Sequence, residues 1–207
     1  MAILKSELLS LEISFTRFDE AGWVHYEICF RWKNELIIND KILKRDGEYW
    51  GARKTGSFLA NEYERDGLTR VISQVLNSNE PEYWEPMEPD MIVAIYPEMY
   101  FPFMKSHHKL VYERDEHRKE REEREKRKKE SGRLPDDIFT IIVFIDAYNF
   151  KDSNAYYGEG ISLHLIADRE TLEKFNSELS KEYAEFKEKY KLDEYQVFSQ
   201  AGRDLQS

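Results

Sequence analysis

Two stretches near the start of the chain alternate apolar and polar residues, and they constrain the fold more than any other feature. The first covers residues 9–16, and the second covers residues 24–32, after a turn that ends at Gly22. Successive side chains of a β-strand point to opposite faces, so a period of two predicts strands with one buried face. Because the connections are short, we expect these two strands and a shorter one at residues 35–40 to form an antiparallel meander.

Further strands are predicted at residues 90–97, 137–148 and 160–168. The run at 137–148 is nearly all apolar, which is typical of a central strand covered on both faces. We expect it to form a hairpin with 160–168. Residues 46–57 contain three glycines and are predicted to form an irregular loop.

Two amphipathic helices are also predicted. The first has apolar residues spaced three or four apart, namely Leu68, Val71, Ile72, Val75 and Leu76, and Asp66 is expected to cap its start. The second is longer, is capped by Asp168, and carries the stripe Leu172, Phe175, Leu179, Tyr183, Phe186 and Tyr190. Burial of that stripe predicts that the long helix lies across the sheet.

The segment 113–133 differs from the rest of the chain in composition. It has eight acidic and ten basic residues and, apart from His117, no aliphatic or aromatic side chain. Several glutamates precede a base by four residues, the favourable orientation for ion pairs along a helix. Without an apolar stripe such a helix has nothing to bury, so we expect a projecting or partly disordered insert.

These elements predict the fold class and the domain organisation. The simplest packing is a single α+β domain over residues 1–207, with helices on one face of a mostly antiparallel sheet of about six strands. Two helices pack on the sheet, and the charged helical insert at about 113–133 projects from it.

Charge and cysteine content restrict the environment and the partners. The net charge of −10 disfavours direct binding to nucleic acid and to anionic membranes, and favours a basic partner. Cys29 is the single cysteine, so no internal disulfide and no cysteine-based zinc site is expected. With no apolar run long enough to cross a bilayer and no apparent secretory signal, we expect a cytoplasmic protein.

Motifs for catalysis, metals and cofactors give no match. The five histidines show no metal-binding spacing, and His25 and His164 would meet only if their strands were neighbours. The loop after Asp152 lacks the glycine and glutamate positions of a calcium loop. Neither phosphate-binding glycine motif occurs, nor does a nucleophile elbow. We therefore expect no metal, no cofactor and no catalytic residue, and interpret Cys29 as structural.

The stretch at 79–90, NEPEYWEPMEPD, is the most distinctive candidate site. It holds five acids, three prolines and an aromatic pair, and no basic residue. The prolines predict a rigid loop. One interpretation is a stiff connection whose rings fold back on the core. The other is a recognition surface made of Glu80, Glu82, Tyr83, Trp84, Glu85, Glu88 and Asp90, in which aromatic anchors face outward among carboxylates that attract a basic partner.

The leading hypothesis is therefore a non-enzymatic binding protein that uses this acidic aromatic surface to engage a basic protein. One concrete form is an immunity or antitoxin-type inhibitor of a cationic nuclease. The alternative is a small hydrolase or transferase with a carboxylate-based site near Asp146 or Glu159. A third hypothesis treats the segment 113–133 as an interaction arm, although it lacks the apolar heptads of a coiled coil.

Overall fold

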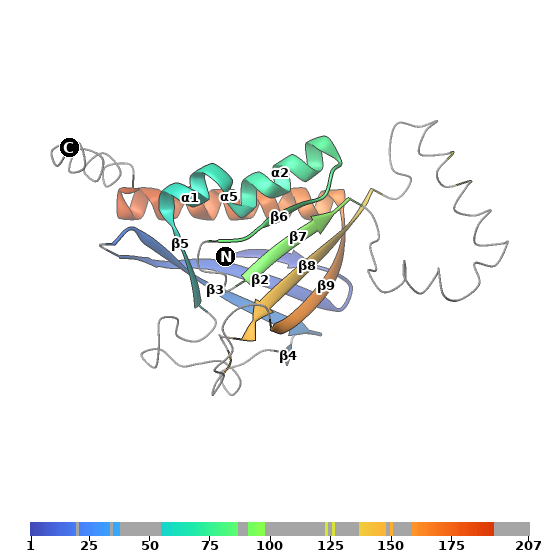
Figure 1. The fold of residues 1–207 in the computed structure, drawn as a ribbon, viewed down its shortest axis with the longest axis horizontal. Helices are drawn as coiled ribbons and strands as arrows, with labels where there is room; N and C mark the ends of the chain where they lie inside the picture. The colour runs from blue at the N-terminus through green and yellow to red at the C-terminus, as the bar shows by residue number, and fades with distance from the viewer. Residues whose placement is uncertain are drawn as a thin grey trace.

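The computed structural model describes residues 1–19, 21–33, 35–37, 55–86, 91–97, 123, 126, 137–147, 150 and 159–192. Over these residues the fold is α+β, with nine strands in two antiparallel sheets and three helices (Figure 1). The predicted fold class is therefore confirmed. The strands are divided between two sheets rather than joined in one.

The first sheet contains the predicted meander. Its strands are β1 (Ala2–Lys5), β2 (Leu9–Phe18), β3 (Trp23–Trp32), β4 (Glu35–Leu36) and β5 (Thr55–Leu59). Strands β1 to β4 follow one another in order, and β5 also pairs with β3. The inward side chains of β2 and β3 are those of the alternating pattern, with Leu11 opposite Phe30 and Ile13 opposite Ile28.

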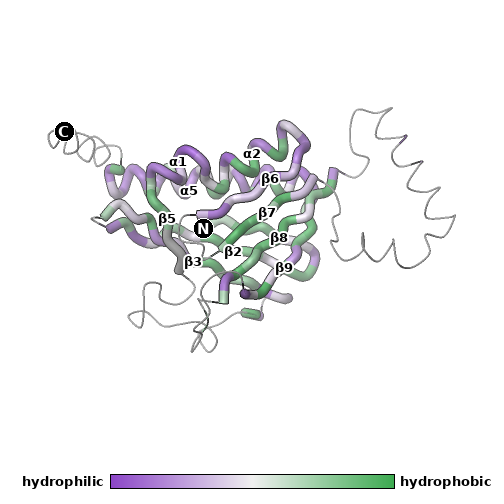
Figure 2. Tube along the Cα trace, in the orientation of Figure 1, coloured by the Kyte–Doolittle hydropathy of each residue, from purple (hydrophilic) through white to green (hydrophobic). Residues whose placement is uncertain are grey.

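The second sheet is built from β6 (Glu82–Trp84), β7 (Met91–Tyr96), β8 (Ile138–Asp146) and β9 (Gly160–Asp168), in that order. Strand β8 lies between β7 and β9, which confirms its predicted central position and its hairpin with β9. Its residues are nearly all apolar, and Figure 2 shows the hydrophobic colour along β7 and β8. Because successive side chains of a strand point to opposite sides, apolar residues of β8 lie on both faces of the sheet.

The first two helices, α1 (Ala60–Asp66) and α2 (Leu68–Ser78), are separated by a sharp break at Gly67. Gly67 ends α1 and begins α2, so the prediction that Asp66 caps α2 is wrong. Asp66 instead pairs with Arg65 and Arg70 on the surface. Helix α2 ends where predicted, and Asn79 adopts the left-handed conformation that closes it.

The third helix, α5 (Arg169–Tyr190), confirms the predicted cap and stripe. The carboxylate of Asp168 accepts a hydrogen bond from the backbone N–H of Thr171 at 2.8 Å. Five residues of the stripe are buried, from Leu172 to Phe186, and Tyr190 is half-buried. The helix packs against β1, β2 and α2, and Figure 1 shows all three helices along one side of the strands.

One hydrophobic core joins the two sheets and the helices. Its centre is a set of seven neighbouring rings, here called the aromatic cluster: Phe15, Tyr26, Phe58, Tyr63, Trp84, Tyr183 and Phe186. These rings come from β2, β3, β5, α1, β6 and α5. The cluster therefore links both sheets to α1 and α5.

Three strands were not predicted from the sequence. They are β1, β5, which begins inside the glycine-rich segment expected to be an irregular loop, and β6, which lies inside the stretch expected to be a rigid loop. Of the charged insert at 113–133, only Glu123 and Lys126 are described, and both are helical and exposed. No helix in the described ranges is long and apolar enough to cross a membrane.

Candidate functional site

The aromatic pair of the candidate site lies on the edge strand β6, where its two rings point to opposite faces of the sheet. Tyr83 is 60% exposed, whereas Trp84 is 5% exposed. Tyr83 lies opposite Ala94 on the outer face, and Trp84 lies opposite Val93 on the core face. Because Ala94 is small, its side chain leaves the flank of the Tyr83 ring uncovered.

Trp84 belongs to the aromatic cluster and not to the surface. Its ring centroid lies 6.0 Å from that of Tyr26, 5.9 Å from that of Phe58 and 5.9 Å from that of Tyr63. The expectation that Trp84 faces outward is therefore wrong. Adjacent residues of a strand must diverge, and the larger ring takes the apolar face because it removes more apolar area from water.

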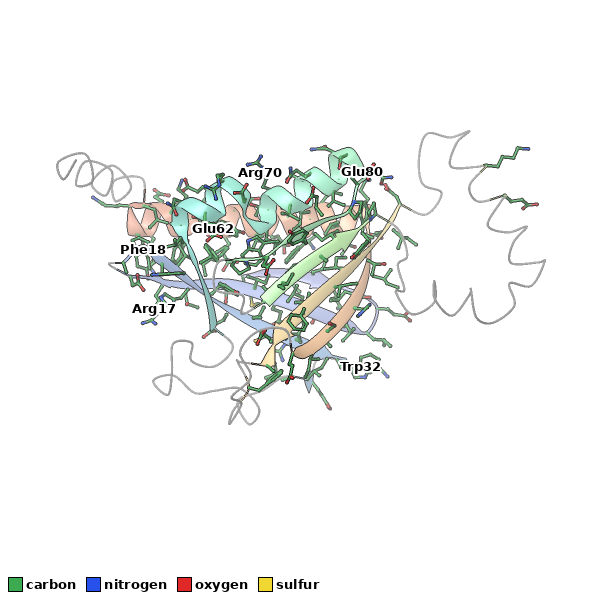
Figure 3. All side chains as sticks on the ribbon, in the orientation of Figure 1. Arg17, Phe18, Trp32, Glu62, Arg70 and Glu80 are labelled. Atoms are coloured by element: carbon green, nitrogen blue, oxygen red, sulfur yellow. The ribbon has the colours of Figure 1, made fainter. Side chains whose placement is uncertain are left out.

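The acidic residues around Tyr83 are placed as expected where the structure describes them. Glu80, Glu82 and Glu85 are exposed. Figure 3 places Glu80 at the turn after α2, at the outer margin of the molecule. Glu80 and Glu82 form no ion pair with any other described residue. Glu88 and Asp90 lie outside the described residues.

The backbone of this segment is fixed at its start and along β6. The preceding turn is held by the left-handed Asn79, whose N–H donates to the carbonyl oxygen of Val75 at 2.9 Å, and by the Ser78 hydroxyl, which accepts from the N–H of Glu80 at 3.1 Å. Strand β6 then pairs with β7, and α2 contacts β6 from the helical layer. Tyr83 is therefore presented from a rigid support.

The carboxylates of the alternative enzyme hypothesis do not converge. Asp146 pairs with Gly160, and Ala147 is hydrogen-bonded to Glu159 one step further along the same ladder. Asp146 and Glu159 are thus in opposite phases of the alternation and point to opposite faces of the sheet. Asp146 is 3% exposed, while Glu159 is exposed. This arrangement does not form the facing pair that acid–base hydrolysis uses.

The histidines considered as a metal pair lie in different sheets, because His25 is on β3 and His164 is on β9. The Nε2 of His25 is 3.0 Å from a carboxylate oxygen of Asp19. Burial raises the pKa of Asp19, but hydrogen bonds from His25 and from the N–H groups of Trp23 and Ala21 outweigh it, so the pKa lies below its ordinary value. This pair braces the β2–β3 turn.

Other candidate sites are partly outside the described residues. The loop after Asp152 and most of the glycine-rich segment at 46–57 fall in undescribed parts of the chain. Within the described ranges, no group of three or more His, Cys, Asp or Glu side chains could hold a metal ion. Cys29 is half-buried on β3, opposite Glu12.

The sequence contained a signal that would have separated the two rings. Residues 82–84, Glu-Tyr-Trp, combine two strand-favouring aromatic residues next to the strand β7, which alternates buried and half-buried residues. Recognition of β6 as a strand would have required Tyr83 and Trp84 to face opposite sides. Flanking prolines at 81 and 86 hid this signal, because proline is confined to the ends and edges of strands.

No known protein family matches the chain, and no characterised protein and no solved structure shows significant similarity to it.

Proposed function

We propose that this protein is a non-enzymatic binding protein that engages a basic protein through the acidic surface around Tyr83. That surface, here called the Tyr83 surface, comprises Tyr83, Glu80, Glu82 and Glu85. The observation that carries the proposal is an aromatic ring that is 60% exposed and is held on a strand at the edge of the second sheet. An inhibitor of the immunity or antitoxin type is the concrete form of this function.

A fixed exposed tyrosine suits the centre of a protein interface. Tyrosine buries a large area with few rotatable bonds, so little conformational entropy is lost when a partner covers it. Here the backbone is already ordered by β7, and Trp84 anchors the strand from the core side. Trp84 thus positions Tyr83 without touching the partner.

The carboxylates give the surface its preference for a basic partner. Exposed acids around an aromatic anchor raise the association rate with a cationic protein, and this effect weakens as salt screens the charges. The net charge of −10 acts in the same direction at longer range. A cationic nuclease has the chemistry that such a surface would recognise.

The proposal is tested by affinity capture with the full chain from an extract of its native cell, at low and high salt. We expect captured proteins of high pI, retained at low salt and released at high salt. For the isolated partner, we expect Tyr83→Ala to weaken binding by about 1–2 kcal/mol or more, which is roughly tenfold in Kd. Glu80→Gln with Glu82→Gln should lower the association rate and its salt dependence.

The matched control is Glu185→Gln with Glu188→Gln, which removes the same charge from exposed positions on α5. It changes the net charge by the same amount, so its association rate should fall much less than that of the Glu80→Gln with Glu82→Gln variant. Partners that are all neutral or acidic, or binding unchanged by both the Tyr83 and the glutamate substitutions, would contradict the proposal.

A further inference from the structure

Within the described part of the chain, strand β9 is a long edge strand with no strand on its outer side. It runs for nine residues, pairs with β8 on one side, and has no described strand on the other. Figure 1 shows it as the outermost strand of its sheet. An open edge presents unpaired backbone N–H and C=O groups, which can pair with the strand of another chain.

Among the described strands β9 is the longest sheet edge, although β5, which pairs only with β3, also has no charged residue and no proline over its five residues. Edge strand β6 has three residues with a proline on either side, β4 has two residues, and β1 has four and ends in Lys5. Natural proteins protect edges by shortness, charge, proline or bulges. Between Gly160 and Asp168, β9 has no charged residue and no proline, and its register with β8 is unbroken.

The direction of the backbone groups follows from the ladder. The Ala147 N–H donates to the carbonyl oxygen of Glu159 at 2.6 Å, in register with the rest of the hairpin. In an antiparallel ladder only every second residue bonds to the neighbour. The odd-numbered residues of β9 therefore bond to β8, while the backbone groups of Gly160, Ser162, His164 and Ile166 point away from it.

The inner face of β9 is also incompletely covered. Leu165 is 1% exposed, Leu163 is half-buried, and Ile161 is 42% exposed, although all three point to the core side. The core side of the sheet thus opens progressively toward the start of β9. An additional strand at this edge would remove apolar area of Ile161 and Leu163 from water.

From these observations we infer that β9 pairs with β9 of a second copy of this chain, so that two four-stranded sheets join into one. The pairing is antiparallel about a two-fold axis at His164. We infer this register because His164 is the middle residue of β9, so that the two strands pair over all nine residues. It places Ser162 opposite the partner's Ile166, and gives roughly six backbone hydrogen bonds from the outward-pointing residues.

The lack of charge on this edge permits a second copy of the chain to pair there and gives a basic protein no advantage. Two molecules that each carry −10 repel, so they can approach most easily where the contact surface is neutral. The strand between Gly160 and Asp168 meets that condition. A basic partner would gain nothing from an uncharged edge and is better matched by the Tyr83 surface. Because an edge contact buries a modest area, we expect a weak, concentration-dependent dimer.

The first test is sedimentation equilibrium of the full chain over a range of concentrations. We expect a monomer–dimer equilibrium in roughly the micromolar range. His164→Pro removes an N–H that points away from β8, so it should raise the dimer dissociation constant by about tenfold or more while the β8–β9 ladder remains. The control His164→Ala keeps that N–H and should dimerise like the wild type.

A second variant tests the register and does not depend on proline being tolerated. In a Cys29→Ser background, His164→Cys places two thiols directly opposite each other across the axis, with Cα atoms about 5.5 Å apart, which is within the range for a disulfide. We expect mild oxidation to give a covalent dimer. Ser162→Cys is the control, because its opposite residue is the partner's Ile166.

The inference fails if the wild-type chain stays monomeric up to roughly millimolar concentration, a range in which even weak pairs associate. It also fails if a dimer forms but folded His164→Pro protein dimerises as tightly as His164→Ala. Equal cross-linking by the two cysteine variants would reject the proposed register. Loss of dimerisation would leave the capture experiments on the Tyr83 surface unaffected, so the two proposals are separable.

Discussion

At the scale of single residues, the neighbouring aromatic residues Tyr83 and Trp84 of β6 have different roles. Trp84 contacts rings from β3, β5 and α1, so it joins the two sheets and the helical layer. Tyr83 makes no comparable ring contact among the described residues and stands on the outer face. A substitution at one position should therefore alter stability, and a substitution at the other should alter binding.

We expect Trp84→Ala to lower the free energy of unfolding by about 3–5 kcal/mol, because the substitution leaves a cavity inside the aromatic cluster. Tyr83→Ala should change it by less than about 1 kcal/mol, since the ring is mostly exposed. Urea unfolding followed by far-UV circular dichroism measures both. Equal losses of stability for the two variants would contradict their assigned positions.

Gly67 separates α1 from α2 and has no room for a side chain. A Cβ atom there would lie 2.3 Å from the carbonyl oxygen of Tyr63 and 2.6 Å from its ring. Tyr63 cannot easily move, because it is buried and its ring stacks on that of Phe58, with the two ring centroids 4.4 Å apart.

We expect Gly67→Ala to lower the free energy of unfolding by about 1–3 kcal/mol, the usual cost of forcing extra volume into a packed site. Thermal unfolding measures the change. Asn61→Ala, at an exposed position of α1, is the control and should be close to neutral. A Gly67→Ala variant as stable as the wild type would show that the helix break can widen at little cost.

At the scale of elements, α5 depends on its cap. Hydrogen bonds from Thr171 to the carboxylate hold the pKa of Asp168 below its ordinary value. A lowered folded-state pKa means that this stabilisation is fully present above the unfolded-state pKa, near 3.9, and is lost as the pH falls through the folded-state pKa.

We expect Asp168→Ala to cost about 1 kcal/mol at neutral pH, with the difference from the wild type shrinking as the pH falls below about 4. Asp168→Asn keeps an oxygen acceptor and should lose less at neutral pH, with no comparable pH dependence. Urea unfolding at pH 7, 5 and 3 is the measurement. If the difference in unfolding free energy between the wild type and Asp168→Ala instead grew toward acid pH, the pKa of Asp168 in the folded state would be raised rather than lowered.

The elements that the sequence predicts well are those whose pattern is long. Strands β2 and β3 are ten residues long each, and α5 carries its stripe over about five turns, so their buried faces follow from periodicity. Strands β5 and β6 are short and contain or adjoin glycine and proline. Their strand conformation depends on pairing with β3 and β7, which local propensity does not report.

The candidate site was predicted only in part for the same reason. The exposure of Tyr83 and of its acidic neighbours at 80, 82 and 85 agrees with the expectation. The burial of Trp84 depends on rings contributed by residues 26, 58 and 63, which approach it only in the folded chain. The composition of residues 79–90 indicated an aromatic surface. Contacts with distant residues place the ring of Trp84 in the core instead.

At the scale of the whole molecule, Arg169 joins three elements at the start of α5. Its side chain pairs with Asp137, which precedes β8, and donates to the carbonyl oxygen of Leu76 in α2 at 3.0 Å. It also lies over the ring of Phe139 in β8, 5.3 Å from the centroid. A guanidinium can make these contacts together because it is planar and carries five donors.

We expect Arg169→Lys to lower the free energy of unfolding by about 1–3 kcal/mol, since an ammonium group cannot hold the carboxylate and the carbonyl oxygen at once. A double-mutant cycle with Asp137→Asn should give a coupling energy of about 0.5 kcal/mol or more. Lys174→Ala, on the exposed face of α5, is the control. Strict additivity would mean that the ion pair contributes nothing to stability.

The division into two sheets could not be predicted from the sequence, because it depends on which distant segments of the chain come into contact. The backbone N–H of Ile3 in β1 donates to Glu178 of α5, 175 residues away, and that of Phe15 donates to Glu182, 167 residues away. Periodicity predicts that each segment has a buried face, but it does not say which faces pack together.

This connection between β1 and α5 has a consequence for biosynthesis. Strand β1 is translated long before the helix that covers it, because Glu178, which accepts from the N–H of Ile3, is added 175 residues later. Until then the rings of the aromatic cluster lack Tyr183 and Phe186, and the nascent chain exposes apolar surface to the cell. We therefore expect stable folding to occur after translation of α5, with chaperones shielding the growing chain before it.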